Sequence, residues 1–289
     1  MNYVLICMKK SDLFLTDIAA YKKYRDFNHI YNRLDLLKEQ DIECEPVGII
    51  PTKFPIVIKP IIDLLAEGAT ENVIYMSNKD EYLSYLNVGE KEGMRCRGQF
   101  WYYKIKGNQY ISNLLLKNGK IVFNDTFVIH KNEDDIISFY NHVYDFILTD
   151  YLTETISIQL ANYTGPVCIN FIDDTIIDCR LSWWRENHIF KKRSDFVSCI
   201  PILLEHKKPF NQLNDDIIYV PFRIDIENDT ESVIRDYVSR LKKYTLDYII
   251  SFSNISNIEN NSLKQICTFV TSSDKLIDVL AIRGKMGLI

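Results

Sequence analysis

A lysine at the end of a short apolar run is the first residue in this sequence whose position suggests chemistry. Residues 54–60 read FPIVIKP, so Lys59 lies between β-branched residues and a proline. A short run of this composition, bounded by prolines, predicts a buried strand and not a helix. A cation is uncommon inside apolar sequence unless it meets an anion, and a phosphate is a suitable anion. The alternative is a structural lysine whose ammonium group reaches solvent from the strand end.

A second candidate is the segment WWRENH at 183–188, in which two adjacent tryptophans are followed by charged and polar residues. Neighbouring side chains on a strand point to opposite faces, so both tryptophans cannot enter one core. We expect one of them to be exposed, or to be covered by another segment or a partner. The segment is therefore a candidate site for a ligand or a protein partner. His188 has no visible partner that would make it a general base.

Composition and charge exclude several classes of function. The chain has 289 residues, a net charge of −5 and a pI near 5.6, which disfavours nucleic-acid binding because that needs a basic surface. The N-terminus lacks the pattern of a signal peptide, and no window approaches the roughly 20 apolar residues of a membrane span. Seven scattered cysteines without CxxC spacing favour reduced thiols in the cytoplasm and give no zinc site.

The abundance of Ile, Asn, Tyr, Lys and Asp is typical of an AT-rich coding sequence. It indicates a large virus, a phage or an AT-rich microbe as the source. If the source is viral, the expected compartment is the host cytoplasm.

The elements that must position these residues predict an α+β protein. Asn118-Gly119 is a strong signal for a hairpin, and Asp173-Asp174 turns a second one. Strands are predicted at 3–8, 47–50, 54–59, 72–76, 100–105, 109–116, 120–130, 165–171, 175–179, 217–224, 247–252 and 264–271, and helical stretches at 16–40, 77–86, 133–152 and 232–244. Residues 89–98 are predicted to be a charged turn.

The order of these elements resembles the ATP-grasp superfamily, in which two α+β subdomains close on a nucleotide. The resemblance covers roughly residues 25–185. Its five pieces are LLKEQDI (36–42) before Pro46, FPIVIKP (54–60), AEGA (66–69) with the helix at 76–86, YYKIKGNQY (102–110) with NGKIV (118–122), and GPVCINFIDDTIIDCRLS (165–182). The order of the pieces persuades more than any one of them.

The resemblance implies an ATP-grasp-like core at 51–208 and a truncated N-terminal α/β segment at 1–50. The elements predicted beyond residue 208 indicate a small C-terminal α+β unit at 209–289. It implies ATP and Mg²⁺ as cofactors. The matching positions are Lys59 and Gly68 for the phosphates, Tyr103, Ile105 and Gln109 for the base and ribose, Asn170 and Asp178 for Mg²⁺, and Arg180 beside the reacting phosphate. A structural role for Asp178, paired with Arg180 or Arg185, remains an alternative. The aromatic run at 100–103 is packing or, alternatively, a platform for the base.

The sequence departs from the family pattern at the positions that matter for catalysis. Arg180 replaces a metal-binding asparagine, and a guanidinium has no acceptor for a cation, although it can pair with phosphate. Gln109 replaces an acid at the ribose position, and Gly68 is alone where several glycines are usual. Ser182 replaces an arginine. These losses weaken the implied metal and nucleotide sites.

Two functions compete on this basis. The first is a degenerate ATP-grasp-fold protein, with nucleotide binding open, acting mainly as a scaffold or protein-interaction module. The alternative is an ATP- and Mg²⁺-dependent ligase that joins a small-molecule carboxylate to an amine or thiol through an acylphosphate. A cleft lined by Lys59, Asp178 and Arg180 would favour a ligand. A cleft filled by Tyr102, Tyr103 or the tryptophans would favour the scaffold.

Overall fold

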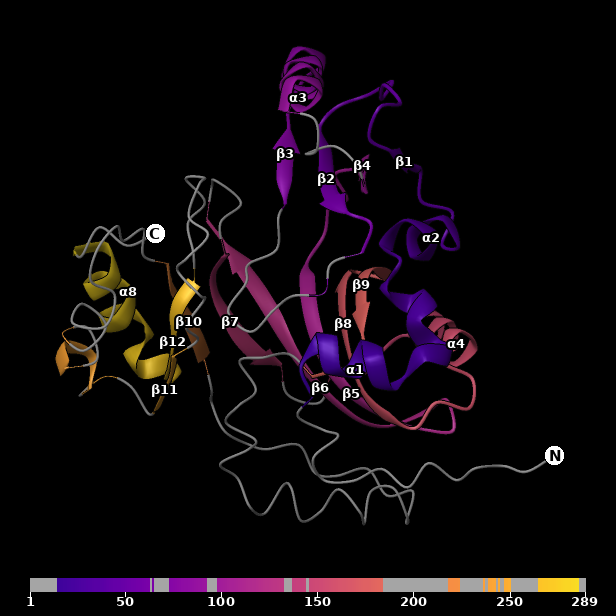
Figure 1. Ribbon diagram of the computed structural model, residues 1–289. Helices are drawn as coiled ribbons and strands as arrows, with labels where there is room; N and C mark the ends of the chain where they lie inside the picture. The colour runs from indigo at the N-terminus through magenta and orange to yellow at the C-terminus, as the bar shows by residue number, and fades with distance from the viewer. Residues whose placement is uncertain are drawn as a thin grey trace.

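The computed structural model describes residues 15–62, 64, 73–92, 98–132, 137–143, 146–183, 218–223, 236, 239–242, 244, 247–250 and 265–285. Within these residues the chain forms two antiparallel sheets with helices packed on them (Figure 1). The α+β class predicted from the sequence is confirmed.

The larger sheet has eight strands in the order β11-β12-β10-β7-β6-β5-β8-β9. Its long central hairpin turns at Asn118 and Gly119, which both have the positive φ angles (50° and 74°) that a tight hairpin turn requires. The strands are β5 (Gln109–Lys117), β6 (Lys120–Lys131), β7 (Ile137–Val143), β8 (Gly165–Ile172), β9 (Thr175–Arg180), β10 (Ile218–Arg223), β11 (Asp247–Ile250) and β12 (Gln265–Thr271).

The smaller sheet has four strands, β1 (Cys44–Pro46), β2 (Ile56–Pro60), β3 (Ile74–Met76) and β4 (Gln99–Tyr103), in the order β1-β4-β2-β3. One face packs against helix α3 (Lys79–Glu92) through Ile56, Ile58 and Trp101 on the sheet and Tyr82 on the helix. The other face packs against β9 and α2 (Arg33–Lys38), since Val57, Phe100 and Tyr102 share a cluster with Ile177 and Leu37. The small sheet therefore turns this second face toward the large sheet.

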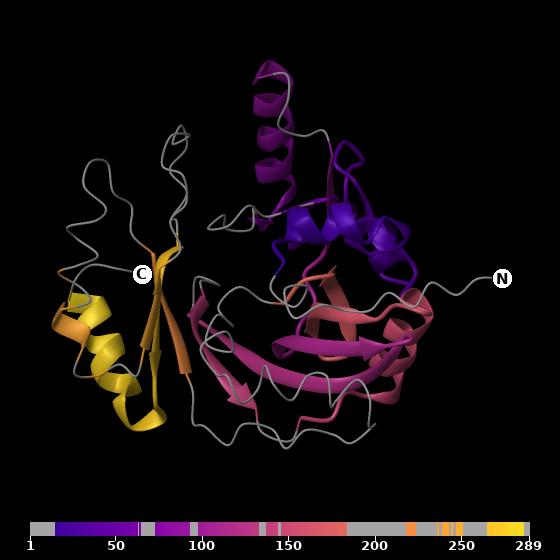
Figure 2. The ribbon, with the colours of Figure 1, turned by 60° about the horizontal axis from the view of Figure 1, so that its bottom comes forward.

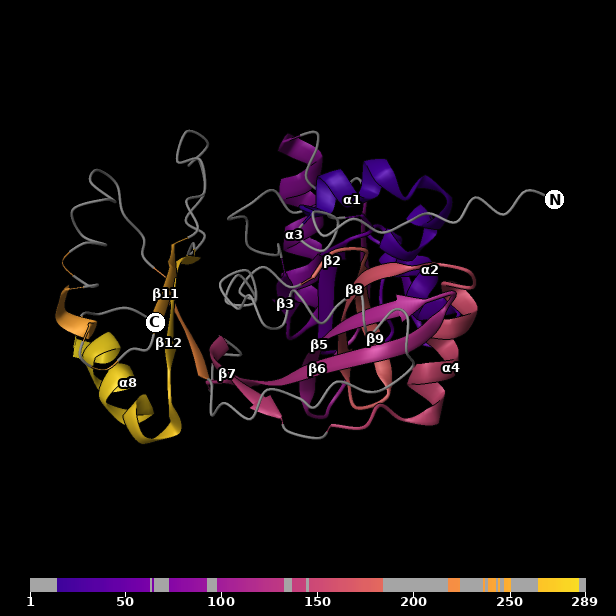
Figure 3. The same cartoon turned by 90° about the horizontal axis from the view of Figure 1, so that it is seen from below.

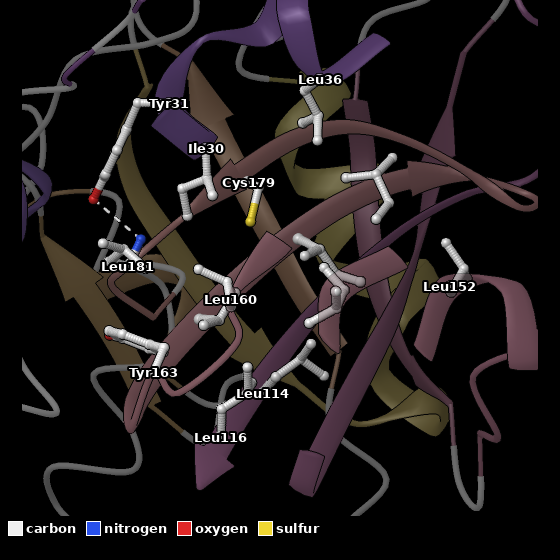
Figure 4. Packing of buried hydrophobic residues seen from close by; sticks show 14 of the residues in the cluster. Ile30, Tyr31, Leu36, Leu114, Leu116, Leu152, Leu160, Tyr163, Cys179 and Leu181 are labelled. Atoms are coloured by element: carbon white, nitrogen blue, oxygen red, sulfur yellow. Dashed lines mark hydrogen bonds between the residues drawn. The ribbon is translucent and has the colours of Figure 1, made fainter. Parts of the chain in front are cut away.

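Short helices cover one face of the large sheet at its β5-β8-β9 end. They are α1 (Asp17–Lys23), the 3₁₀ helix η2 (Arg25–Tyr31), α2, and α4 (Asp150–Gln159). Side chains of Thr16, Asn32 and Thr149 cap the N-termini of α1, α2 and α4, which explains where these helices begin. Figure 4 shows the resulting core, in which the Leu181 N–H donates to the Tyr31 hydroxyl at 3.0 Å.

The C-terminal strands extend the large sheet beyond β7. β10 pairs with β7 at Ile218↔Asn141 and Tyr219↔Tyr140, and β12 pairs with β10. Helix α8 (Leu276–Lys285) follows a short 3₁₀ turn, η5 (Ser273–Lys275). Two views place these elements at the end of the sheet opposite α4 (Figures 2 and 3).

Some predicted elements are wrong. A helix is expected at 133–152, but residues 137–143 form β7, and among the described residues of this range the helix begins at Asp150, in α4. The apolar spacing there fits a helix, but pairing with β6 on one side and β10 on the other decides for a strand. The short strand lies at 44–46 and not 47–50, which is turn, and α3 runs to Glu92, into the turn expected at 89–98.

Both predicted hairpins and the strands at 54–59, 100–105, 165–171 and 175–179 are confirmed, with ends shifted by a few residues. The strand predicted at 3–8 and most of the helix at 232–244 lie outside the described residues. The boundary at 208/209 lies outside them too.

Candidate functional site

A buried ion pair forms where the two sheets meet. Asp178 on β9 is 5% exposed, and Arg33, the first residue of α2, is 1% exposed. The Arg33 guanidinium donates from Nε to Asp178 Oδ1 at 2.8 Å and from Nη2 to Oδ2 at 3.0 Å. The Arg33 backbone N–H donates to the Ile61 carbonyl at 2.9 Å, just beyond β2. A two-pronged contact of this kind is among the strongest that side chains make.

Arg180 binds the same carboxylate, at the oxygen that also accepts from Arg33 Nη2. Its Nε and Nη2 lie 2.8 and 2.7 Å from Asp178 Oδ2, and its Nη1 lies 2.8 Å from Asp17 Oδ2. The Ser182 hydroxyl donates to the other oxygen of Asp17. Asp17 lies at the start of α1 and is itself buried. The network thus joins α1, α2 and β9.

Lys59 lies beside this network, as the resemblance implies. It is 3% exposed on β2, opposite Phe100 on β4, and shares a sheet face with Val57 and Tyr102. That face is the one turned toward β9. The resemblance assigns Lys59, Asp178 and Arg180 to one site, and the three residues lie near one another in the structure. Their roles in binding phosphate and metal stay predictions.

The charges around Asp178 keep it ionised. Burial by itself would raise the pKa of Asp178, but the guanidinium groups of Arg180 and Arg33 and the ammonium group of Lys59 outweigh it. The pKa of Asp178 therefore lies well below its usual range. Three positively charged side chains thus favour the ionised form of this one carboxylate.

The residues proposed for Mg²⁺ have side-chain oxygen atoms that already accept hydrogen bonds from other side chains of the protein. Asn170 lies opposite Asp178 in the β8–β9 register, and its Oδ1 accepts a hydrogen bond from Gln109 Nε2 at 2.9 Å. Both oxygens of Asp178 accept from arginines. Mg²⁺ requires several free oxygen ligands in near-octahedral geometry, so this donor set does not fit the ion as it stands. The magnesium assignment stays a prediction, and the alternative of Asp178 paired with Arg180 agrees with these contacts.

The residues proposed for the base and ribose do not all share one side of the small sheet. Tyr103 lies opposite Ile56 in the β2–β4 register, on the face that packs against α3, whereas Lys59 lies on the other face. The Tyr103 hydroxyl contacts Thr52 Oγ1 at 3.0 Å and donates to Glu43 Oε1 at 3.3 Å. Ile105 is half-buried and packs on the Lys59 side, in the cluster that contains Ile177. Gly68 lies outside the described residues.

The tryptophan segment is described only at its first residue. Trp183 is buried, donates from Nε1 to the Leu114 carbonyl at 2.7 Å, and packs near Phe123. Residues 184–188 lie outside the described residues, so a partner at this segment stays a prediction. Tyr102 is buried in the cluster between the small sheet and β9 and so occupies part of the space between the two sheets.

Sequence reasoning missed Arg33 and Asp17. Arg33 is one of 34 lysines and arginines, and only its place after the capping Asn32 distinguishes it. Neither residue lies in a motif that marks ion pairing across about 145 or 163 positions of sequence. No local signal would have found them.

Two further features are absent from the part of the chain that the structure describes. Among the described residues, no three His, Cys, Asp or Glu side chains come together as a metal-binding group. No helix among them is long and apolar enough to cross a membrane.

Known structures share this arrangement of sheets. The L-amino acid ligase from Bacillus licheniformis matches with a TM-score of 0.53 at 10% identity, over 89% of this chain and 71% of its own. The carboxyaminoimidazole ribonucleotide synthase from Aspergillus clavatus, complexed with ATP, matches with a TM-score of 0.58 at 10% identity, over 91% and 75%. This chain has the ATP-grasp fold.

A third ATP-grasp structure, the N5-carboxyaminoimidazole synthetase from Staphylococcus aureus complexed with ADP, matches with a TM-score of 0.54 at 10% identity, over 89% and 70%. No family model matches the sequence, and no curated protein matches it. At these identities the ATP-grasp similarity establishes the fold and leaves the reaction open. The resemblance stated from the sequence is confirmed at that level.

Proposed function

We propose that this protein is a catalytically silent ATP-grasp-fold protein that acts mainly as a scaffold or protein-interaction module. In this proposal the cations where the two sheets meet remain as a site for the phosphates of a nucleotide. The protein does not carry out Mg²⁺-dependent ligation.

The observation that carries the proposal is the closed network around Asp178. Ligation through an acylphosphate needs cations that contact the reacting phosphate and neutralise its charge. Here the guanidinium groups of Arg33 and Arg180 are already paired with Asp178, and Arg180 also binds Asp17. Breaking a buried ion pair typically costs about 3–5 kcal/mol, so the network favours staying closed.

Exposed apolar side chains also support an interaction module. Tyr151 and Ile158 lie two turns apart on one side of α4, and Ile147 precedes the helix; all three are exposed. Figure 3 shows α4 at the outer edge of the molecule. Grouped apolar residues on a surface are a common feature of protein contacts.

The second candidate is an active carboxylate–amine or carboxylate–thiol ligase. It is favoured by one specific observation. Lys59 is buried near Asp178, and it lies on β2, the strand on which the resemblance implies the phosphate-contacting lysine. In that case Lys59 and Arg180 would hold the phosphates, after Arg180 had left Asp178.

The test is turnover of ATP in the presence of Mg²⁺ and pooled carboxylates, amines and thiols. Released ADP and phosphate are quantified, and coupled products are sought by mass spectrometry. Lys59→Ala serves as the site variant and Lys120→Ala, an exposed lysine at the far hairpin, as its matched control. We expect no release above that of Lys59→Ala. Turnover that is retained in Lys120→Ala and lost in folded Lys59→Ala would establish the ligase instead.

A further inference from the structure

We propose that the cluster binds the phosphates of its ligand without a divalent metal ion, and that Arg33 and Arg180 supply the positive charge in its place. The inference rests on the proposed function, because it specifies how that nucleotide-phosphate site works. Its ligand class is a metal-free polyphosphate anion, such as the triphosphate of free ATP.

The first argument is the donor set. A divalent ion here would need oxygen atoms from Asp178 and Asn170. Each oxygen of Asp178 lies within 3.0 Å of an arginine nitrogen, and Asn170 Oδ1 lies 2.9 Å from Gln109 Nε2. An ion coordinated by both residues would compete with the hydrogen-bond donors that these oxygens already have, Gln109 at Asn170 and the arginines at Asp178.

The second argument is charge. Arg33, Arg180 and Lys59 all lie close enough to Asp178 to lower its pKa, so a divalent cation at this carboxylate would meet three positive groups. Arg33 cannot lose its proton in a protein, so its repulsion would not be relieved. A polyphosphate is attracted instead, because the three cations outnumber the two carboxylates of the cluster, Asp178 and Asp17.

The third argument is the geometry of Arg180. Arg180 is the more exposed of the two arginines, since 13% of its side chain is exposed against 1% for Arg33. A guanidinium presents a planar fork that matches two oxygens of a phosphate. In this structure Asp178 and Asp17 occupy the fork, from β9 and α1, so a phosphate would bind Arg180 by replacing one of these carboxylates. Arg33 holds Asp178 in turn, which makes Arg33 a positioning residue for Arg180.

The experiment is calorimetric titration of the full chain with ATP and, separately, with inorganic tripolyphosphate. Each probe is titrated in excess EDTA and in excess Mg²⁺. We expect both probes to bind in EDTA with a Kd equal to or lower than that in Mg²⁺, because the metal removes charge from the phosphates. Tighter binding in Mg²⁺ by about tenfold or more would overturn the inference and leave the nucleotide site in place.

Two variants locate the binding. Arg180→Gln removes the fork at a partly buried position and should weaken tripolyphosphate binding in EDTA by about tenfold or more. Arg240→Gln, in an exposed pair with Asp236, is the matched control and should bind as the wild type does. Equal affinity of both variants would overturn the assignment. The wild-type comparison of EDTA with Mg²⁺ needs no variant and so does not depend on Arg180→Gln folding.

The failures of the two proposals are distinguishable. Absence of heat with either probe, from folded protein, overturns metal-free binding while the scaffold function remains. Turnover of ATP in the assay above overturns the silent function, even if binding without metal is found.

Discussion

At the scale of single residues, Asp178 organises the cluster because it is the carboxylate that two arginines share. Arg33 and Arg180 reach it from different elements, and Lys59 lowers its pKa further. The sequence offered Arg180 or Arg185 as a partner of Asp178, and Arg180 is one, but it gave no sign of Arg33. Arg33 lies 145 positions from Asp178 in the sequence.

Replacing Asp178 should destabilise the protein. Asp178→Asn leaves the buried Arg33 without the carboxylate that it binds and leaves Arg180 with Asp17 alone, so we expect the free energy of unfolding to fall by about 3–5 kcal/mol. Urea denaturation measures this. Asp236→Asn, in an exposed pair with Arg240, should change it by less than about 0.5 kcal/mol. A loss below about 1 kcal/mol for Asp178→Asn would contradict the network.

The same residue predicts a pH dependence. The pKa of Asp178 is lower in the folded than in the unfolded chain, so its stabilising contribution is complete above the unfolded pKa, near 4. The contribution is lost as pH falls below that value, toward the lower folded pKa. We expect wild-type stability to fall more steeply than that of Asp178→Asn between about pH 5 and pH 2. Urea midpoints across this range measure the slopes, and parallel slopes would refute the assignment.

At the scale of elements, the loop at 104–108 connects β4 of the small sheet to β5 of the large sheet. The loop contacts the β8–β9 turn, where the Asn108 N–H donates to Asp173 Oδ1 at 3.1 Å and the Asp173 N–H donates to the Asn108 carbonyl at 3.0 Å. Gly107 has a φ of +148°, and a Cβ there would lie 2.1 Å from Asp173 Oδ2. Close packing therefore ties this connection to the strand that carries Asp178.

A side chain at position 107 should disturb this contact. Gly107→Ala adds both backbone strain and a clash with Asp173, so we expect a loss of about 1–3 kcal/mol in unfolding free energy. Asp173→Ala in the same chain should recover part of the loss, which a double-mutant cycle by urea denaturation measures. Gly284→Ala, in α8 with open space around it, is the control and should be neutral or slightly stabilising. Equal effects of the two alanine variants would contradict the contact.

At the scale of the whole molecule, the C-terminal strands belong to the same sheet as the core. β10 joins β7, and Tyr219 on β10 packs edge-on against Phe127 on β6, with ring centroids 5.3 Å apart. Tyr219 is buried in a cluster that also contains Tyr140 and Ile129. The continuous sheet runs from the C-terminal strands to β9, where the ion pairs lie.

This continuity predicts that the C-terminal strands and the core unfold together. Tyr219→Ala removes a buried aromatic ring and should lower the free energy of unfolding by about 3–5 kcal/mol. Calorimetry should then show one transition, shifted as a whole to lower temperature. Ile277→Ala, at an exposed position on α8, should leave the transition nearly unchanged. A second transition that moves alone in Tyr219→Ala would show an independent C-terminal unit.

The sequence by itself determined the fold class, the two hairpins and the neighbourhood of Lys59, Asp178 and Arg180. The fold class and the hairpins follow from local patterns, since Asn118-Gly119 and the apolar strands predict the same structure in most contexts. The neighbourhood of the three charged residues came from the resemblance to the ATP-grasp superfamily, which relates segments that are far apart in the sequence. Tertiary structure decided between strand and helix at 137–143, where pairing with β6 and β10 outweighed helical spacing. It also decided the face on which Tyr103 lies and the partners of Asp178, because both depend on sheet register and on contacts between residues distant in sequence.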